Sequence, residues 1–118
     1  MIQGIGIDII ELDRMKRSLD KNEKILQRVL TKAERDCFSS LRSERRKLEF
    51  LAGRFAAKEA FAKATGRGIG KLSFQDIQIL PLEHGAPRLE AKGYQKEKIW
   101  VSISHSQAYA VAQVIIEA

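Results

Sequence analysis

The longest helical pattern in the sequence lies in the middle of the chain, at residues 44–65. Its inward stripe recurs at spacings of three and four residues, which is one face of an α-helix. The stripe consists of Leu48, Leu51, Phe55, Glu59 and Ala62. Ser43 is a suitable N-cap and Gly66 a suitable terminator. The pattern therefore predicts one long helix, and it places the carboxylate of Glu59 where an apolar side chain is expected.

The patterns on either side of this helix predict an α+β domain. An apolar strand comes first, at residues 4–12, and three short helices follow it. Thr31 and Glu34 form a capping-box pair at the start of the third of these helices. After residue 70 the period changes to that of strands, with turns at His84-Gly85 and Gly93. The short helices are expected at 11–22, 23–30 and 31–41, and the strands of an antiparallel meander at 76–82, 86–92, 98–106 and 108–117.

The length of the chain and the pattern of its last strand indicate how many domains it forms and whether subunits associate. A chain of 118 residues predicts a single domain, residues 1–118. Residues 108–117 are apolar on both faces of the predicted strand. A small domain has difficulty burying both faces, so the pattern suggests that strands of neighbouring subunits pack together.

The first strand contains an aspartate that does not fit its surroundings. Isoleucines at positions 5, 7, 9 and 10 predict a buried strand. Asp8 lies among them, and a carboxylate removed from water is costly unless a cation, a hydrogen-bond donor or a proton compensates it. Another part of the chain must therefore supply a partner for Asp8.

Asp8 and Glu59 are two carboxylates projecting from a strand and a helix toward apolar surroundings. Such a pair suits Mg²⁺, which takes one or two carboxylates and fills its octahedron with water and phosphate oxygens. Alternatively, each carboxylate is separately salt-bridged. Lys63 follows Glu59 by four residues, as in an ordinary helix ion pair. Three basic residues lie close to the face of the predicted helix that carries Glu59, and together they could hold a polyphosphate. They are Arg54, Lys58 and Lys63.

Charge and composition limit the classes of partner. Residues 11–67 hold sixteen Lys and Arg against nine Asp and Glu, within a net charge of +6. This excess suggests an acidic partner, or else a solvated helical surface. Aromatic residues make up only 7%, so a base-stacking surface for nucleic acid is poorly supplied. Apolar runs are too short to cross a membrane. The single cysteine, Cys37, excludes an intramolecular disulfide and favours the cytoplasm.

Other motifs are weaker. His105 lies in ISHS on the apolar face of a predicted strand, where it is either structural or directed at a ligand. The glycines of GRGIG, residues 66–70, follow a helix rather than precede one, so they indicate a helix end more than a phosphate loop. Cys37 has no neighbouring histidine in the sequence to support a nucleophilic role.

Four segments occur together in the order found in one enzyme family. They are GIGIDIIEL with Asp8, GRFAAKEAFAKATGRG with Glu59 and Lys63, HGAPRLE, and WVSISHS with His105. In these segments and in its length, the chain resembles the holo-acyl-carrier-protein synthases, which are bacterial-type 4′-phosphopantetheinyl transferases. The resemblance extends from residue 4 to about residue 116.

This resemblance implies a reaction and a site. Such enzymes transfer the phosphopantetheine arm of coenzyme A to a serine of apo-acyl carrier protein in fatty acid biosynthesis, releasing adenosine 3′,5′-bisphosphate. They are Mg²⁺-dependent homotrimers with active sites between subunits. By resemblance, Asp8 and Glu59 are metal ligands, and together with Lys63 they are the catalytic residues. Glu59, or less strongly Asp36, is the candidate general base.

The resemblance also implies two binding surfaces. The coenzyme would contact Arg54, Lys58, Lys63, Gly85, Ala86, Pro87, His105 and Ser106. The acidic carrier protein would dock on Arg14, Lys21, Lys24, Arg28 and Arg45. Two other interpretations remain open: a basic module that binds an acidic protein or RNA without chemistry, and a structural trimer whose carboxylates only form salt bridges between subunits.

Overall fold

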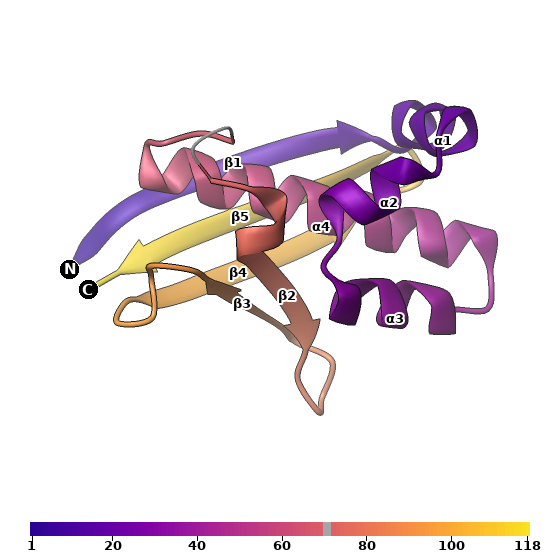
Figure 1. Cartoon of the computed structure of the whole chain (residues 1–118). Helices are drawn as coiled ribbons and strands as arrows, with labels where there is room; N and C mark the ends of the chain where they lie inside the picture. Colours follow the sequence, from indigo (N-terminus) through magenta and orange to yellow (C-terminus); the bar gives the residue numbers. More distant parts are fainter. Residues whose placement is uncertain (70–71) are drawn as a thin grey trace.

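The computed structural model describes residues 1–69 and 72–118, and it has the predicted α+β architecture (Figure 1). One strand leads into four helices, of which the last is the longest, and four strands complete the chain. The elements are β1 (Ile2–Glu11), α1 (Leu12–Lys21), α2 (Lys24–Val29), α3 (Lys32–Ser40), α4 (Glu44–Thr65), a 3₁₀ turn η1 (Phe74–Asp76), β2 (Ile77–Pro81), β3 (Pro87–Ala91), β4 (Lys98–His105) and β5 (Tyr109–Glu117).

The long helix α4 begins and ends where its capping residues predict. The Ser43 side chain accepts a hydrogen bond from the Arg46 amide, and Gly66 adopts the left-handed conformation, with φ 76°. The capping box of Thr31 and Glu34 is also present at the start of α3. These boundaries follow from local side-chain chemistry. Gly70, the last glycine of the GRGIG stretch, lies outside the described residues.

The C-terminal strands do not form the predicted meander. β5 lies between β1 and β4 in an antiparallel sheet of order β1-β5-β4, while β2 and β3 pair separately as a hairpin. The strand and turn positions are correct, with positive φ at Gly85 and Gly93. The predicted pairing is wrong, because β5 pairs with the N-terminal strand β1 as well as with β4. A strand about a hundred residues away cannot be identified as a partner from the local sequence pattern.

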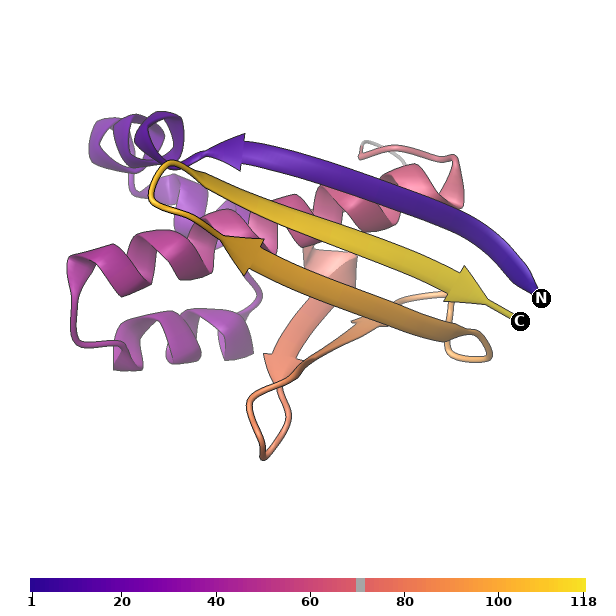
Figure 2. The same ribbon diagram turned by 180° about the vertical axis from the view of Figure 1, so that it is seen from behind.

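Helix α4 covers one face of the three-stranded sheet, and no helix of the described residues lies on the other face (Figures 1 and 2). Beneath α4, alternate residues of β5 are buried: Ala110, Ala112, Val114 and Ile116. The strand therefore has an apolar side in the core and a second side turned outward.

The predicted burial of the first strand is wrong for three of its isoleucines. Ile5, Ile7 and Ile9 are 57%, 58% and 61% exposed on the uncovered face. The alternate residues Gly4, Gly6, Asp8 and Ile10 face α4 instead. A Cβ at Gly4 or Gly6 would lie only 1.9 Å from a carbonyl oxygen of α4, so the two elements approach more closely than other residues would allow.

Candidate functional site

Asp8 and Lys63 meet where β1 crosses the C-terminal half of α4. The Lys63 Nζ donates to Asp8 Oδ1 at 3.0 Å and to the Ile7 carbonyl oxygen at 2.9 Å. Lys63 thus turns toward the strand rather than pairing with Glu59 along the helix. The Asp8 side chain is only 15% exposed. The predicted partner of Asp8 is therefore, in part, this ammonium group.

The second carboxylate oxygen of Asp8 has no such partner. Asp8 Oδ2 is buried and accepts no hydrogen bond. A salt bridge of the kind that the alternative interpretation expects accounts for one oxygen only. A buried oxygen acceptor without a donor is costly, and it is a group that a cation can satisfy.

Glu59 lies close enough to Asp8 to be affected by its charge. The pKa of Glu59 is raised above its usual value, first by loss of solvent and then by repulsion from Asp8, while Lys63 acts in the opposite direction. The first cause reflects partial burial and the second a like charge nearby, and the ammonium of Lys63 does not offset the two. Asp8 and Glu59 therefore form a pair of hard oxygen donors with too little cationic compensation.

This donor set fits Mg²⁺. Within residues 1–69 and 72–118, no three His, Cys, Asp or Glu side chains are grouped as a metal cage would need. Mg²⁺ requires no such cage, because it is bound through one or two carboxylates and keeps water or phosphate oxygens as its other ligands. Asp8 and Glu59 can hold Mg²⁺, with Asp8 Oδ2 available.

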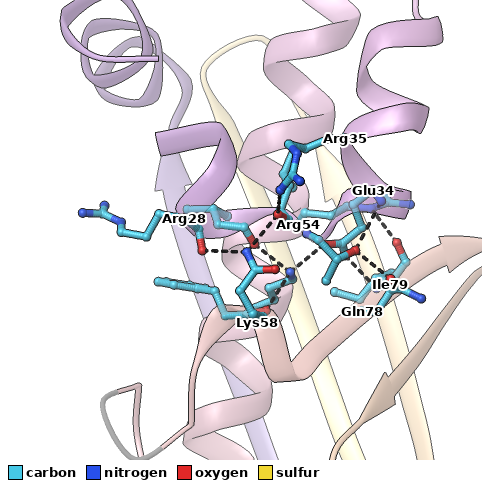
Figure 3. Close-up of polar contacts among 12 residues, drawn as sticks. Arg28, Glu34, Arg35, Arg54, Lys58, Gln78 and Ile79 are labelled. Carbon is cyan, nitrogen blue, oxygen red and sulfur yellow. Dashed lines mark hydrogen bonds and ion pairs between the residues drawn. The ribbon is translucent and has the colours of Figure 1, made fainter. Parts of the chain in front are cut away.

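Lys58 is not at this site, contrary to the prediction that it binds the coenzyme. Its side chain is completely buried, and Nζ donates to Glu34 Oε1 at 2.6 Å and to the carbonyl oxygens of Val29 and Phe74 (Figure 3). The adjacent Glu59 faces β1 instead. One residue turns a helix by 100°, which is enough to send Lys58 into the interior.

A second group of predicted residues lines an open cavity of about 290 Å³ on the β4 side of the molecule. Of the predicted coenzyme-binding residues it brings together Arg54, Gly85, Pro87 and His105. Arg54 donates to the Ile79 carbonyl oxygen and lies over the Phe50 ring, 4.2 Å from its centroid. The cavity therefore combines a guanidinium, an imidazole and the turn between β2 and β3.

Ala86 and Ser106, which are also predicted to contact the coenzyme, accept hydrogen bonds within two nearby turns. Ala86 closes the same turn by accepting from the Leu82 amide at 2.8 Å. The Ser106 hydroxyl accepts from the Tyr109 amide at 3.2 Å in the β4–β5 turn. Arg46 and Glu49 also line the cavity and are not among the residues predicted from the sequence. Their spacing on α4 carries no signal by itself, because the cavity forms only when β4 and the distant turn pack there.

Four of the five basic residues predicted to dock a carrier protein lie on α1 and α2, and the fifth, Arg45, lies apart from them on α4. Arg14 and Arg28 line a groove of about 440 Å³ with Met15, Ile25 and Phe55. Lys21 ends α1 and Lys24 begins α2, so both flank the connection between these helices. Arg45 lies at the start of α4, where its guanidinium donates to the carbonyl oxygens of Ser106 and Gln107.

Asp36, the weaker candidate base, pairs with Lys32 on an exposed part of α3. Cys37 is a free thiol on the same helix. Neither residue lines the two cavities described above. Within residues 1–69 and 72–118, no helix combines the length and apolar character needed to cross a membrane.

Comparisons with known proteins cover almost the whole chain. Residues 4–114 match the model of the 4′-phosphopantetheinyl transferase superfamily. The chain is 56% identical over 117 residues to the holo-[acyl-carrier-protein] synthase of Oceanobacillus iheyensis, covering 99% of this chain and 98% of that one. It is 58% identical over 118 residues to the synthase of a Geobacillus species, with the same coverage.

A solved structure agrees with the fold. The holo-(acyl-carrier-protein) synthase of Bacillus anthracis, in complex with coenzyme A (3′,5′-ADP), is 49% identical to this chain. It superposes with a TM-score of 0.91 and covers 100% of this chain and 98% of its own. By the match over residues 4–114 and by relatives above 50% identity, this chain is an enzyme of the 4′-phosphopantetheinyl transferase superfamily.

Proposed function

We propose that this enzyme transfers the 4′-phosphopantetheine group of coenzyme A to a serine of apo-acyl carrier protein, in a Mg²⁺-dependent reaction of fatty acid biosynthesis. Adenosine 3′,5′-bisphosphate is the second product. The observation that carries the proposal is the pair of under-compensated carboxylates, Asp8 and Glu59, beside the ammonium of Lys63. Such a set suits the transfer of a phosphoryl group, where catalysis is mainly positioning and charge neutralisation.

The residues have distinct roles in this proposal. Asp8 and Glu59 hold Mg²⁺, which when bound neutralises negative charge on the pyrophosphate of coenzyme A. The serine oxygen forms a bond to the β-phosphorus as the bond to the bridging oxygen of the leaving nucleotide breaks. Glu59 accepts the serine proton, directly or through water. Lys63 neutralises or protonates the leaving phosphate.

The coenzyme is proposed to place its nucleotide end in the cavity lined by Arg54, Gly85, Pro87 and His105. This cavity lies on the β4 side of the sheet, whereas Asp8 lies on β1, with β5 between the two strands. We therefore propose that one coenzyme molecule is shared by two subunits, as it would be in a homotrimer. The exposed isoleucines of β1 support such an interface, because monomers rarely leave a large apolar patch uncovered.

The acidic carrier protein is proposed to dock near α1 and α2, on Arg14, Arg28, Lys21 and Lys24. Arg45 is left out of this proposed surface, because its guanidinium is engaged by Glu49 and the β4–β5 turn. The groove that contains Arg14 and Arg28 is lined also by Ile9 and Ile10, which flank the metal site in sequence. Replacing Arg14 by Glu should raise the KM for carrier protein far more than the KM for coenzyme A. Equal rises in both constants would remove α1 from the docking surface.

Intact-mass measurement tests the reaction. Apo-acyl carrier protein is incubated with the enzyme, coenzyme A and Mg²⁺, alongside samples with EDTA or without enzyme. The proposal expects the carrier to gain one phosphopantetheine, about 340 Da, only in the complete mixture. A carrier of unchanged mass with folded enzyme and several different apo-carriers would refute it. The cytoplasm, where a single free thiol stays reduced, is the proposed compartment.

A further inference from the structure

The carboxylate of Glu49 lies in the cavity where the proposed function places the phosphate groups of coenzyme A, which it cannot contact favourably. Glu49 lines the same cavity as Arg46, Arg54 and His105, and its side chain is only 19% exposed. The nucleotide end of coenzyme A carries phosphate groups. A carboxylate facing them would repel the ligand unless its charge is already engaged by the protein. The role of Glu49 must therefore lie in its protein contacts.

Those contacts connect three parts of the chain. Glu49 Oε2 accepts from Arg45 Nε at 3.1 Å, one turn earlier on α4. The same oxygen lies 3.4 Å from Nδ1 of His105, the last residue of β4. Arg45 in turn donates through Nη2 to the carbonyl oxygens of Ser106 and Gln107, at 3.0 and 2.8 Å. The carboxylate of Glu49 thus joins the strand end to the helix, and Arg45, which contacts that carboxylate, joins the turn to the helix.

The short approach of this carboxylate bears on how the imidazole of His105 is presented. A carboxylate beside Nδ1 favours the proton on that nitrogen. Nε2, on the opposite side of the ring, then faces away from Glu49 and remains the nitrogen that can meet a ligand. Arg45 contacts both the carboxylate and the β4–β5 turn, so it ties the position of Glu49 to that of the turn.

We propose that Glu49 is a positioning residue for coenzyme A, which acts by orienting His105 through Nδ1. The inference rests on the proposed function, because it assumes that the cavity receives the nucleotide end of the coenzyme. Glu49 does not contact the reacting phosphorus in this proposal. Its loss should weaken coenzyme binding and leave carrier recognition unchanged.

Kinetics of Glu49→Gln provide the first test, because this change keeps the size of the side chain and removes its charge. The KM for coenzyme A should rise about tenfold or more, as expected when a charged hydrogen-bonding partner is lost. The KM for carrier protein and the far-ultraviolet circular dichroism should stay as in the wild type. Glu44→Gln, the same change in the exposed first turn of α4, is the matched control. Equal KM rises for both substrates, or none, would overturn the proposal.

A double-mutant cycle tests whether Glu49 acts through His105. In a His105→Ala background, Glu49→Gln should add much less to the KM for coenzyme A than it adds in the wild type. An undiminished effect in that background would contradict the assigned route.

The imidazole spectrum provides a test independent of turnover. Long-range ¹H–¹⁵N spectra of His105 should show the proton mainly on Nδ1 in the wild type and shift toward the Nε2 form in Glu49→Gln. An unchanged tautomer would refute the orienting role. Calorimetric titration with adenosine 3′,5′-bisphosphate should show the same loss of affinity as the kinetics. Because neither readout uses the transfer reaction, failure of the proposed function and failure of this inference are distinguishable.

Discussion

Lys58 and Glu59 are consecutive residues of α4, yet their charged groups meet opposite surroundings. The ammonium of Lys58 is buried with three oxygen acceptors, one of them a carboxylate oxygen of Glu34. Glu34 also accepts from the amides of Thr31 and Ile79. Burial lowers the pKa of Lys58, and Glu34 opposes that effect. The pair holds α3, α4 and β2 together, so its role is structural.

Breaking this buried pair should be costly because it leaves an uncompensated charge in the interior. We expect Lys58→Met to lower the free energy of unfolding by about 3–5 kcal/mol. Combining it with Glu34→Gln should cost less than the sum of the two single changes. Urea denaturation at fixed protein concentration measures both. Lys32→Met, which removes an exposed ion pair, should change stability by about 0.5 kcal/mol or less. A similarly small loss for Lys58→Met would contradict this interpretation.

Glu59 should make the stability of the metal-free protein depend on pH. Its pKa is raised above 4.5 in the folded state, so the folded protein binds more protons than the unfolded chain at pH values between 4.5 and the raised pKa. Stability from this group is therefore present below pH 4.5 and is lost as pH rises through that interval. Replacing Glu59 by Gln removes the titrating carboxyl group, so the variant should not show this loss of stability with rising pH.

Thermal midpoints of the two proteins, measured from pH 4 to 8 without metal, test this directly. The midpoint of Glu59→Gln minus that of the wild type should increase with pH and then level off. Glu44→Gln should give a flat difference. A difference for Glu59→Gln that is flat or declines with pH would show that burial and Asp8 do not perturb this carboxyl group.

At the scale of elements, the junction of β1 and α4 determines whether the site can form. Gly4 and Gly6 bring the strand against the backbone of Ala64 and Ala60. Asp8 follows on the same face of β1, and this close approach places it beside Lys63. The glycines of GIGID are therefore as necessary to the site as the aspartate is.

Gly6→Ala should separate the strand from the helix, because the new Cβ would meet the Ala60 carbonyl oxygen at 1.9 Å. We expect a loss of more than about 2 kcal/mol in unfolding free energy, since backbone atoms cannot turn aside as a side chain can. Gly66→Ala, at a positive φ with open space around it, should cost only about 1 kcal/mol. Equal losses in denaturant titrations would argue against a tight junction.

Sequence patterns predict these elements unevenly, for physical reasons. The ends of α3 and α4 follow from Thr31, Ser43 and Gly66, whose effects are local. The order of strands in the sheet does not follow from local effects, because β5 pairs with a strand at the other end of the chain. Asp8 and Glu59 could be singled out as misplaced charges, whereas the spacing of Lys63 predicts only a helix ion pair with Glu59 and not its contact with Asp8. Glu49 could not, because its cavity depends on segments that meet only in the folded chain.

At the scale of the whole molecule, one face of the three-stranded sheet has no helix over it in the described part of the chain (Figure 2). Ile5, Ile7 and Ile9 lie there, and Val111 and Ile115 of β5 are their partners opposite Ile9 and Ile5. The isoleucines that the sequence predicts as buried are exposed in the single chain. A trimer that packs these strands together would bury them and bring the two candidate substrate regions of neighbouring subunits into reach.

Sedimentation velocity tests this assembly. The wild type should sediment as a trimer at micromolar concentration, and Ile7→Glu should dissociate it, because three carboxylates would be buried without partners. The dissociated protein should lose transfer activity while keeping its secondary structure. Gln95→Glu, on an exposed turn, should remain trimeric and active. A monomeric wild type, or a trimer that survives Ile7→Glu, would contradict the interface.

The most direct test of the central claim is the initial rate of phosphopantetheine transfer as a function of free Mg²⁺, for the wild type, Asp8→Asn and Glu44→Gln. If Asp8 and Glu59 hold the metal, wild type and Glu44→Gln should share one saturable Mg²⁺ dependence. Asp8→Asn, folded and trimeric, should lose at least about a hundredfold in rate at the same Mg²⁺ concentration. A normal rate with a normal Mg²⁺ dependence in Asp8→Asn would show that the metal is bound elsewhere and that Asp8 serves only to pair with Lys63.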